Sequence, residues 1–473
     1  MSHQILAALA ALAVGAASAA RVDVDYAKAV RPVRPALHSS GFASLMNRPF
    51  AKESDAWIKS MNFDFVRTHD LALVNAGARV VDNHFIFPLA GLDATKAENY
   101  FFKPTDYLLR LQRDLGLKIF YRLGTSIEHT GEVHFNALVP DDFGKVAENF
   151  AATIRHYNRG WAKGFEWNIP YWEIWNEPDG IRNMWCLPGK EGKDAAAMRA
   201  KFVAFFVTCL KRLKGEFPDV KIGGPALCSA KTDYVRALLQ GCKEAGVKPD
   251  FLSWHYYGHS PADLIAGAAK VKAVVDAFGM GPMEYIINEW HYLPKGGFAA
   301  LRSRDPKTSV AANEGPASIN GIDSAAFTLT TLAALQTSIY DQAYFYGCSH
   351  VGAWGFRDAR GRLNKNYYAL KAFGSLMADG AQICAATSDA PSVTAFAVRG
   401  ADGAKALLVV DYRGKDGTID VAVKGVDAGA TASVKLLSDA CDLAETPAEW
   451  ADGRLRLVKP DAHSAAFLVR FGK

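Results

Sequence analysis

Cysteine is scarce in this sequence, and the cysteines present follow no pattern typical of a specialised class of protein. The 473 residues include seven cysteines, without a Cys-x-x-Cys pair and without zinc-finger spacing. A disulfide-held scaffold and a structural zinc module are therefore not expected. Most of the cysteines are expected to be small buried hydrophobic residues. The sequence also lacks an internal repeat of fixed period, which is the signature of a repeat protein.

An excess of charge of either sign is also missing. Lys and Arg number 54 against 49 Asp and Glu, and no long block of Lys or Arg occurs, so nucleic acid is a poor candidate for a partner. Half of the residues are apolar and 22% are charged, a balance that excludes a largely disordered or collagen-like chain. The length suits a large barrel together with a second module.

Long apolar runs are absent, with one short exception at the N-terminus. Residues 5–17 carry no charge and are followed by Ser18-Ala19-Ala20 and Arg21. This run is too short to span a bilayer, and the small residues suit a signal-peptidase site. Residues 1–20 are therefore predicted to be a signal peptide, although residues 1–4 lack the usual Lys or Arg; the alternative is an apolar leader that stays attached. With no membrane span expected, we predict export to the periplasm or the extracellular space.

Between about residue 36 and residue 377, eight strand-like runs alternate with eight helix-like stretches. The expected strands are residues 37–42, 63–69, 118–123, 171–175, 221–224, 251–254, 285–288 and 342–346. They show little alternation of polar and apolar residues, as is typical of parallel strands buried on both faces. This order of elements predicts an α/β fold, a (β/α)8 TIM barrel, that we assign to residues 21–379.

The pattern changes after about residue 380. Six short strands are expected there, separated by turns rich in Gly, Asp and Ala: residues 393–399, 405–412, 418–423, 432–437, 454–458 and 465–471. Such spacing predicts a C-terminal antiparallel β-sandwich domain over residues 380–473. Because no low-complexity linker precedes it, we expect the two domains to pack together.

Two of the expected barrel strands end in Asn-Glu. Asn176-Glu177 follows the fourth strand and Asn288-Glu289 ends the seventh. Active sites of TIM barrels lie at the C-terminal ends of the strands, where these two carboxyls would face each other across the barrel mouth. Glycoside cleavage needs one carboxyl that protonates the leaving oxygen and one carboxylate at the anomeric carbon. The environment must therefore keep one of them protonated and the other charged.

The segment Trp175-Asn176-Glu177-Pro178-Asp179, with Glu289 ending a later strand, resembles clan A of the retaining glycoside hydrolases. Within that clan the chain resembles glycoside hydrolase family 39, the β-xylosidase and α-L-iduronidase family. The supporting segments stand in order along residues 36–470: Val66-Arg67-Thr68-His69, Trp254-His255-Tyr256-Tyr257, Trp354-Gly355-Phe356 and Asn366-Tyr367-Tyr368-Ala369-Leu370, which leads into the terminal sandwich.

The resemblance implies a role for each residue of the site. Glu177 corresponds to the general acid/base and Glu289 to the nucleophile, with their carboxyls about 5–5.5 Å apart as in retaining enzymes. Asn176 corresponds to the residue that binds the sugar 2-hydroxyl. Arg67 would lie beside Glu289 and help to keep it ionised, unless it only forms a structural ion pair at the barrel rim.

Four further side chains are expected to contact the sugar or the nucleophile. His69 and His255 lie near strand ends, where they either bind sugar hydroxyls or serve a structural role. Strand alternation favours Tyr257 over Tyr256 as the donor to the nucleophile, because Tyr257 shares a face with His255. Trp354 is expected to form an apolar platform beneath the sugar.

The chemistry implied by the resemblance needs no metal or organic cofactor. The cluster Glu128, His129, Glu132 and His134 matches no helical metal-ligand spacing, and we interpret it as a solvated loop.

The match to the family departs from the pattern of β-xylosidases at two places, and these departures leave the preferred sugar open. Asp179 stands where β-xylosidases often carry Asn, and Asn288-Glu289-Trp290-His291 differs from their Thr-Glu-Phe/Trp-Asn. The insertions at residues 82–99 and 294–316 either wall a pocket for one sugar or frame an open cleft. The sequence therefore predicts a retaining, exo-acting, β-xylosidase-like glycosidase acting on a glycoside. The alternatives are an endo-acting polysaccharide hydrolase and a non-catalytic carbohydrate-binding barrel.

Overall fold

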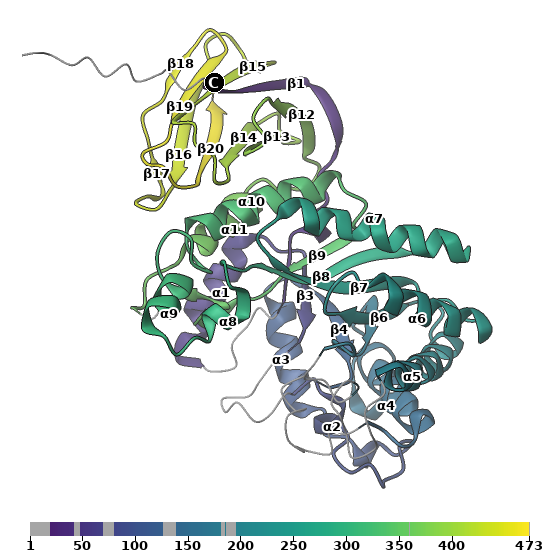
Figure 1. Ribbon diagram of the computed structural model, residues 1–473. Coiled ribbons are helices and arrows are strands. Elements are labelled where there is room, and N and C mark those ends of the chain that lie inside the picture. Colours follow the sequence, from purple (N-terminus) through teal and green to yellow (C-terminus); the bar gives the residue numbers. More distant parts are fainter. Residues whose placement is uncertain are drawn as a thin grey trace, which may run out of the picture.

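The protein consists of a barrel and a second sheet placed at one end of the molecule (Figure 1). The computed structural model describes residues 19–41, 48–69, 80–125, 139–180, 185, 195–358 and 360–472. Almost all of the expected signal peptide, and the whole cluster from Glu128 to His134, lie outside these residues. Within them, no helix has the length and hydropathy that a bilayer span requires.

The barrel has eight strands, all parallel, and it closes between its first and last strand through Ser39 and Tyr344. In barrel order the strands are β2 (Ser39–Gly41), β3 (Phe65–Thr68), β4 (Lys118–Leu123), β5 (Tyr171–Ile174), β6 (Lys221–Leu227), β7 (Phe251–Gly258), β8 (Glu284–Tyr292) and β9 (Gln342–Phe345). The predicted TIM barrel is confirmed. Its interior is packed with aromatic rings, and Phe120 lies 5.1 Å from Tyr344 and 5.4 Å from Phe251, measured between centroids.

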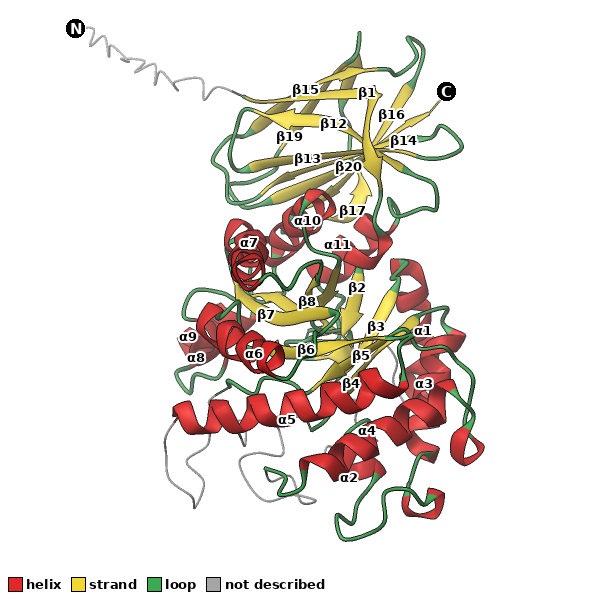
Figure 2. Ribbon diagram, turned by 90° about the vertical axis from the view of Figure 1, so that its right-hand side faces the viewer, coloured by secondary structure: helices red, strands yellow, loops and turns green. Residues whose placement is uncertain are grey.

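Helices surround the barrel, as Figure 2 shows. The longer ones are α1 (Arg48–Met61), α3 (Lys103–Asp114), α4 (Phe143–Asn158), α5 (Ala195–Glu216), α6 (Thr232–Glu244), α7 (Pro261–Phe278), α10 (Ile322–Thr337) and α11 (Lys365–Gly374). Side-chain caps begin several of them; for example, Asp142 accepts the backbone N–H of Lys145, and Ser260 accepts that of Asp263. The two expected insertions carry the short helices α2 (Asn83–Ile86), α8 (Gly297–Leu301) and α9 (Pro306–Asn313). A small two-stranded sheet, β10 (Ser349–Val351) and β11 (Gly355–Arg357), follows β9.

The second body is a curled sheet of ten strands in the order β17-β16-β20-β14-β13-β12-β1-β15-β19-β18. Its strands are β1 (Ala20–Pro32), β12 (Gln382–Ser388), β13 (Val393–Arg399), β14 (Lys405–Asp411), β15 (Thr418–Lys424), β16 (Thr431–Leu437), β17 (Asp442–Glu445), β18 (Glu449–Ala451), β19 (Arg454–Val458) and β20 (Ala465–Gly472). All pairs are antiparallel except β1 with β15. The six strands predicted from the sequence are all present.

The strand β1 corrects the predicted domain division, which assigned residues from 21 onward to the barrel. Residues 20–32 lie between β12 and β15, inside the second sheet. The sequence carries a period-2 signal for this strand: Val22, Val24 and Tyr26 are buried, while Arg21 and Asp23 face solvent. Its partners lie 350 or more residues away in sequence, so the signal alone did not reveal the pairing.

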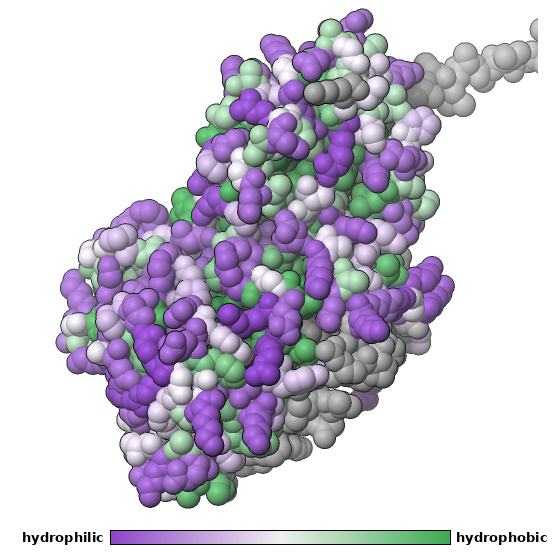
Figure 3. Space-filling model, turned by 180° about the vertical axis from the view of Figure 1, so that it is seen from behind, coloured by the Kyte–Doolittle hydropathy of each residue, from purple (hydrophilic) through white to green (hydrophobic). Residues whose placement is uncertain are grey.

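The two bodies pack together, as expected, through helices α10 and α11 (Figure 2). One side of the curled sheet contributes Phe396, Leu408 and Leu468 to the same apolar cluster as the barrel helices. The rings of Phe373 and Phe396 stack across this junction with centroids 5.4 Å apart. On the face shown in Figure 3, hydrophilic side chains cover most of the described surface and hydrophobic ones lie in small patches.

Candidate active site

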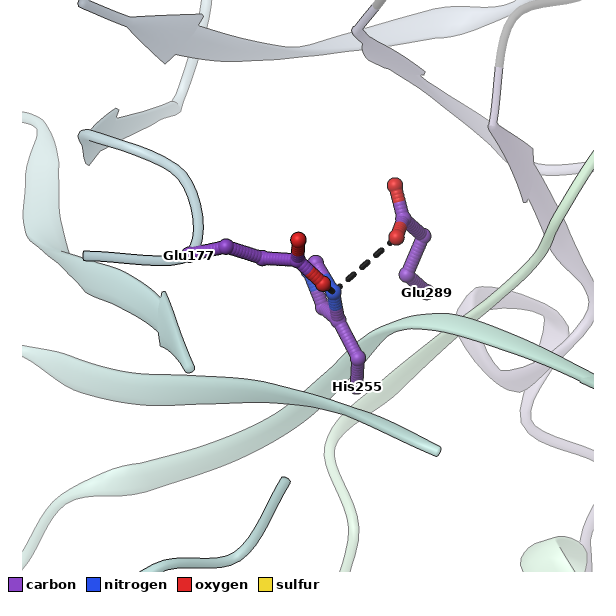
Figure 4. A group of neighbouring side chains, drawn as sticks. All are labelled: Glu177, His255 and Glu289. Carbon is purple, nitrogen blue, oxygen red and sulfur yellow. Dashed lines mark hydrogen bonds and ion pairs between the residues drawn. The ribbon is translucent and has the colours of Figure 1, made fainter. Parts of the chain in front are cut away.

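The C-terminal ends of four strands bring the predicted residues to one place at the barrel mouth. Arg67 and His69 come from β3, Asn176 and Glu177 follow β5, His255 and Tyr257 lie on β7, and Asn288 and Glu289 lie on β8. Figure 4 shows Glu177 and Glu289 directed toward each other, with the imidazole of His255 between them.

The separation of the two carboxylates is short. One oxygen of Glu177, one oxygen of Glu289 and a ring nitrogen of His255 all lie within 4.8 Å of one another. Retaining glycosidases hold their carboxyls about 5–5.5 Å apart, whereas inverting enzymes need roughly 6.5–9.5 Å to admit a water molecule. The geometry therefore suits a double displacement. The same three side chains are also the one group of metal-ligand type found within the described part of the chain.

Glu289 is surrounded by hydrogen-bond donors. Its Oε1 lies 3.2 Å from His69 Nε2 and 3.4 Å from Arg67 Nη1. Its Oε2 accepts a hydrogen bond of 2.9 Å from the Tyr257 hydroxyl and lies 2.9 Å from His255 Nδ1. Donors on both oxygens hold the carboxylate in a single orientation, which a nucleophile requires. Tyr256, by contrast, directs its hydroxyl to the backbone oxygen of Ser260.

Arg67 lies closer to two other side chains than it does to Glu289. Its Nε donates to Glu173 at 2.7 Å and its Nη2 donates to Asn176 Oδ1 at 2.8 Å. Glu173 is fully buried and also accepts from Ser253 and Asn288, each at 2.6 Å. Arg67 is therefore mainly the centre of a buried ion-pair network that orients the Asn176 amide, and its 3.4 Å contact with Glu289 is secondary.

His255 contacts both carboxylates through Nδ1, which lies 2.8 Å from Glu177 Oε1 and 2.9 Å from Glu289 Oε2. Burial lowers the pKa of this imidazole, but the charge of Glu289 and the hydrogen bonds to both carboxylates outweigh burial and raise the pKa to about 9. In the free protein at neutral pH, His255 is consequently a cation.

Glu177 is affected in the opposite sense. Burial raises the pKa of this carboxyl, but the hydrogen bond and positive charge of His255 outweigh burial and bring the pKa below its usual value. The sequence predicts that one of the two carboxyls is protonated. The raised pKa of His255 instead favours a proton on this imidazole, one hydrogen bond away from Glu177.

The loop that carries Glu177 is held in an unusual backbone conformation. Trp175 and Glu177 have φ angles of 80° and 45°, so successive side chains point in different directions. Trp175 turns outward against Trp185 and Phe205, while Glu177 faces the site. The close approach of Trp175 requires a glycine at position 124, where a Cβ would lie 2.6 Å from the ring.

Asp179 fastens this loop to the end of β6. One of its oxygens accepts the backbone N–H of Cys228 at 2.9 Å, and the other lies 2.8 Å from Lys231 Nζ. The Cys228 thiol in turn helps to lower the pKa of the Glu177 carboxyl. Asp179 departs from the family pattern in the sequence, but no motif points to Cys228 or Lys231.

Aromatic rings line the nucleophile side of the site. Trp354 is partly exposed, and its ring lies 5.6 Å from Tyr257, 5.5 Å from Tyr346 and 5.2 Å from His291. Phe298 of α8 packs against Tyr257 at 5.3 Å. Trp290 is fully buried against Phe345 and belongs to the core.

Comparison with known proteins gives three kinds of match. The family model described as "Glycosyl hydrolases family 39" matches residues 20–273. A β-xylosidase from Geobacillus stearothermophilus is 28% identical over 124 residues, which cover 26% of this chain and 22% of that protein. An α-L-iduronidase from Canis lupus familiaris is 26% identical over 271 residues, which cover 54% of this chain and 38% of that protein. The chain thus spans less than two fifths of either of these relatives.

Solved structures match over almost the whole chain. A glucosidase from Croceicoccus marinus has a TM-score of 0.74 at 18% identity, with 96% of this chain and 99% of that chain covered. The GH39 enzyme from Xanthomonas axonopodis pv. citri has a TM-score of 0.68 at 16% identity, with 97% of this chain and 99% of that chain covered. A monomeric β-xylosidase from Caulobacter crescentus has a TM-score of 0.64 at 17% identity, with 95% of this chain and 99% of that chain covered. At these identities the likeness shows the shared fold.

Proposed function

Because the chain belongs to family 39 of the glycosyl hydrolases, we propose that it hydrolyses an O-glycosyl bond with retention of configuration, through Glu177 and Glu289. The observation that carries this proposal is the placement of the two carboxylates, whose nearest oxygens lie within 4.8 Å across the barrel mouth. That spacing suits attack by one carboxylate on the anomeric carbon while the other serves the leaving oxygen. A binding protein would gain nothing from two opposed negative charges at this distance.

In the first step, Glu289 attacks the anomeric carbon and the bond to the leaving oxygen breaks. Tyr257 and His69 hold the attacking carboxylate through the contacts described above. The leaving oxygen takes a proton from Glu177, and a covalent glycosyl-enzyme ester remains on Glu289. In the second step, Glu177 removes a proton from water, which displaces Glu289 at the same carbon.

His255 supplies the proton that Glu177 needs. The charge of Glu289 is the largest of the influences that raise the pKa of His255. When Glu289 becomes an ester it loses this charge, so the imidazolium becomes a stronger acid as the leaving oxygen needs a proton. The proton passes from His255 Nδ1 to Glu177 along their 2.8 Å hydrogen bond, and the second step returns it.

The substrate is a β-xyloside or a similar glycoside, from which the protein removes one terminal sugar. The names of the two matched relatives, a β-xylosidase and an α-L-iduronidase, support a sugar of this kind. The insertion at residues 294–316 supports exo action, because its helix α8 places Phe298 against Tyr257 and Trp354 and so walls one side of the site. The apolar run at residues 5–17 supports export.

A panel of nitrophenyl glycosides tests the proposal. The wild-type protein is expected to release nitrophenol from one of the β-D-xyloside, α-L-arabinoside, β-D-glucoside, β-D-galactoside or α-L-iduronide. The variant Glu289→Gln should lose turnover of every substrate, whereas Glu177→Gln should retain activity on dinitrophenyl glycosides, whose leaving group needs little protonation. Glu284→Gln, at the opposite end of β8, is the matched control and should behave as wild type. Equal losses in both site variants on a dinitrophenyl substrate would contradict the assigned roles.

A second experiment separates exo from endo action. On a xylan, single sugars as first products support exo action, and mixed oligomers would indicate endo action.

A further inference from the structure

The second sheet touches the barrel at a place that concerns catalysis. Tyr412 and Arg413, in the turn after β14, reach the C-terminal ends of β7 and β8. Arg413 Nη2 donates to the Tyr292 hydroxyl at 2.6 Å, and the Tyr412 hydroxyl donates to the backbone oxygen of His259 at 2.7 Å. Tyr292 is the last residue of β8, and His259 comes directly after β7.

These two strand ends carry the nucleophile and the imidazole that bridges the carboxylates. In the parallel pairing of β7 with β8, Gly258 lies opposite Tyr292 and His255 lies opposite Glu289. The contacts of Tyr412 and Arg413 therefore fall on the same strand pair as the catalytic groups, three residues beyond Glu289.

The strand segment around Glu289 pairs irregularly with both of its neighbouring strands. Its register with β7 shifts between Trp254 and His255, and its register with β9 shifts between Ile287 and Trp290. At such irregularities the ladder of backbone hydrogen bonds is locally disrupted, so the strand depends more on side-chain contacts for its position.

Arg413 is itself fixed in place by several contacts. Its Nε donates to Asp323 at 2.9 Å, and the other oxygen of Asp323 accepts from the Ser464 hydroxyl at 2.7 Å. Ser464 is fully buried, and its oxygen also accepts the backbone N–H of Arg413 at 3.0 Å. Asp323 lies in the first turn of α10, where a negative charge is favoured. The guanidinium also lies over the rings of Tyr292 and Tyr412.

We propose that Arg413 is a positioning residue for the reaction: by fastening Tyr292 to Asp323 and the second sheet, it holds the β7–β8 strand pair so that Glu289 and His255 keep their alignment. The second sheet is then part of the catalytic unit. This inference rests on the proposed function of Glu177 and Glu289. Displacements of about 1 Å at a reacting centre can lower rates up to roughly a hundredfold, so a modest shift of β8 is sufficient for a measurable effect.

The test compares two arginines that both join the second sheet to the barrel. Arg413→Gln removes the proposed contact. Arg470→Gln is the matched control, because Arg470 donates to the Ser375 hydroxyl at 2.8 Å, just after α11 and away from β7 and β8. At a temperature well below unfolding, R413Q is expected to lower kcat about tenfold with KM within about twofold, R413K to recover part of the loss, and R470Q to keep the wild-type kcat. Tyr292→Phe, which removes the acceptor hydroxyl from the barrel side, should reproduce the loss in R413Q.

Hydrogen exchange supplies a readout that is independent of activity. Peptides from β7 and β8 should exchange faster in R413Q than in wild type and should be unchanged in R470Q. A wild-type protein without turnover would contradict the proposed function, and the exchange comparison would still decide the role of Arg413. The inference is overturned if R413Q keeps both the wild-type kcat and the wild-type exchange of these strands, or if R470Q shows the same losses.

Discussion

At the scale of single residues, the proton near the two carboxylates determines what the site can do. His255 lies within 3 Å of both Glu177 and Glu289 and is fully buried. A carboxyl with a lowered pKa is a poor proton store at neutral pH, whereas an imidazolium with a pKa of about 9 is a good one. In the proposed mechanism, His255 therefore holds the proton and Glu177 transfers it to the leaving oxygen.

This division predicts the alkaline side of the pH profile. Because the pKa of His255 is raised to about 9, its proton is present below that pH and is lost above it. We expect kcat/KM to fall as the pH rises through about 9. The variant His255→Asn keeps a neutral donor but removes the charge, so its alkaline limb should move to lower pH by more than about one unit. The exposed His463 provides the control, and H463N should leave the profile unchanged. An alkaline limb that is identical in wild type and H255N would show that His255 does not supply the proton.

The neighbouring tyrosines provide a second comparison at this scale. Tyr257 donates to Glu289, whereas Tyr256, one residue earlier, donates to the backbone of Ser260. Removing the Tyr257 hydroxyl in Y257F should lower kcat by about 10- to 100-fold, because the nucleophile loses a donor that orients it. Y256F should retain at least half of the wild-type kcat. Steady-state kinetics on the preferred nitrophenyl glycoside measures both, and equal effects would contradict the assignment.

Some of this could be predicted from the sequence and some could not. Glu177 and Glu289 are recognisable because each follows a strand within a local motif, and the face of Tyr257 follows from strand alternation. The bridge made by His255 depends on distances between three strands, which no local pattern encodes. The same holds for the contacts of Asp179 with Cys228 and Lys231, where only an unusual residue in the motif gave a signal.

At the scale of elements, the loop after β5 depends on its contact with the loop after β4. Gly124 has a φ of 110°, and a Cβ there would lie 2.6 Å from the Trp175 ring. Because Trp175 and Glu177 share this strained loop, crowding of the indole is expected to displace the Glu177 carboxylate.

Replacing each of two glycines by alanine separates the effect of backbone strain from the effect of crowding against the Trp175 ring. Gly116 also has a positive φ, of 85°, but a Cβ there would meet nothing within 4 Å. Both G124A and G116A should lose about 1–3 kcal/mol of stability from backbone strain. Activity should fall at least tenfold in G124A and stay near wild type in G116A. Thermal unfolding and kinetics check both expectations, and an active G124A would show that Trp175 does not position Glu177.

The prediction of elements succeeded where the signal was local. The eight barrel strands and six strands of the second sheet were found because each is a short β-rich run between turns. The strands β17 and β18 were missed because they are short and largely exposed at the edges of the sheet. No strand was predicted for β1 or β12 either, and the pairing of β1 joins segments from opposite ends of the chain.

At the scale of the whole molecule, β1 joins the two ends of the chain. It lies near the middle of the ten-stranded sheet, and Val22, Val24 and Tyr26 are each no more than 2% exposed. A central strand supplies hydrogen bonds to both neighbours as well as apolar burial, so its loss leaves β12 and β15 as unpaired edges.

Two truncations test this dependence. Removal of residues 1–18 should leave the fold unchanged, because the described strand begins at Ala20. Removal of residues 1–32 should cost about 5 kcal/mol or more from lost apolar burial, and the second sheet should fail to form. Circular dichroism and thermal unfolding of both proteins measure the difference. Equal melting temperatures would contradict the central place of β1.

The central claim is that Glu289 becomes covalently attached to the sugar. The most direct measurement is to incubate the protein with the 2-deoxy-2-fluoro glycosyl fluoride of the preferred sugar, beginning with β-D-xylose, and to map the modified peptide by mass spectrometry. We expect slow loss of activity together with one sugar attached to Glu289, and no label in E289Q. Hydrolysis with inversion of configuration, or a label on a carboxylate other than Glu289, would contradict it.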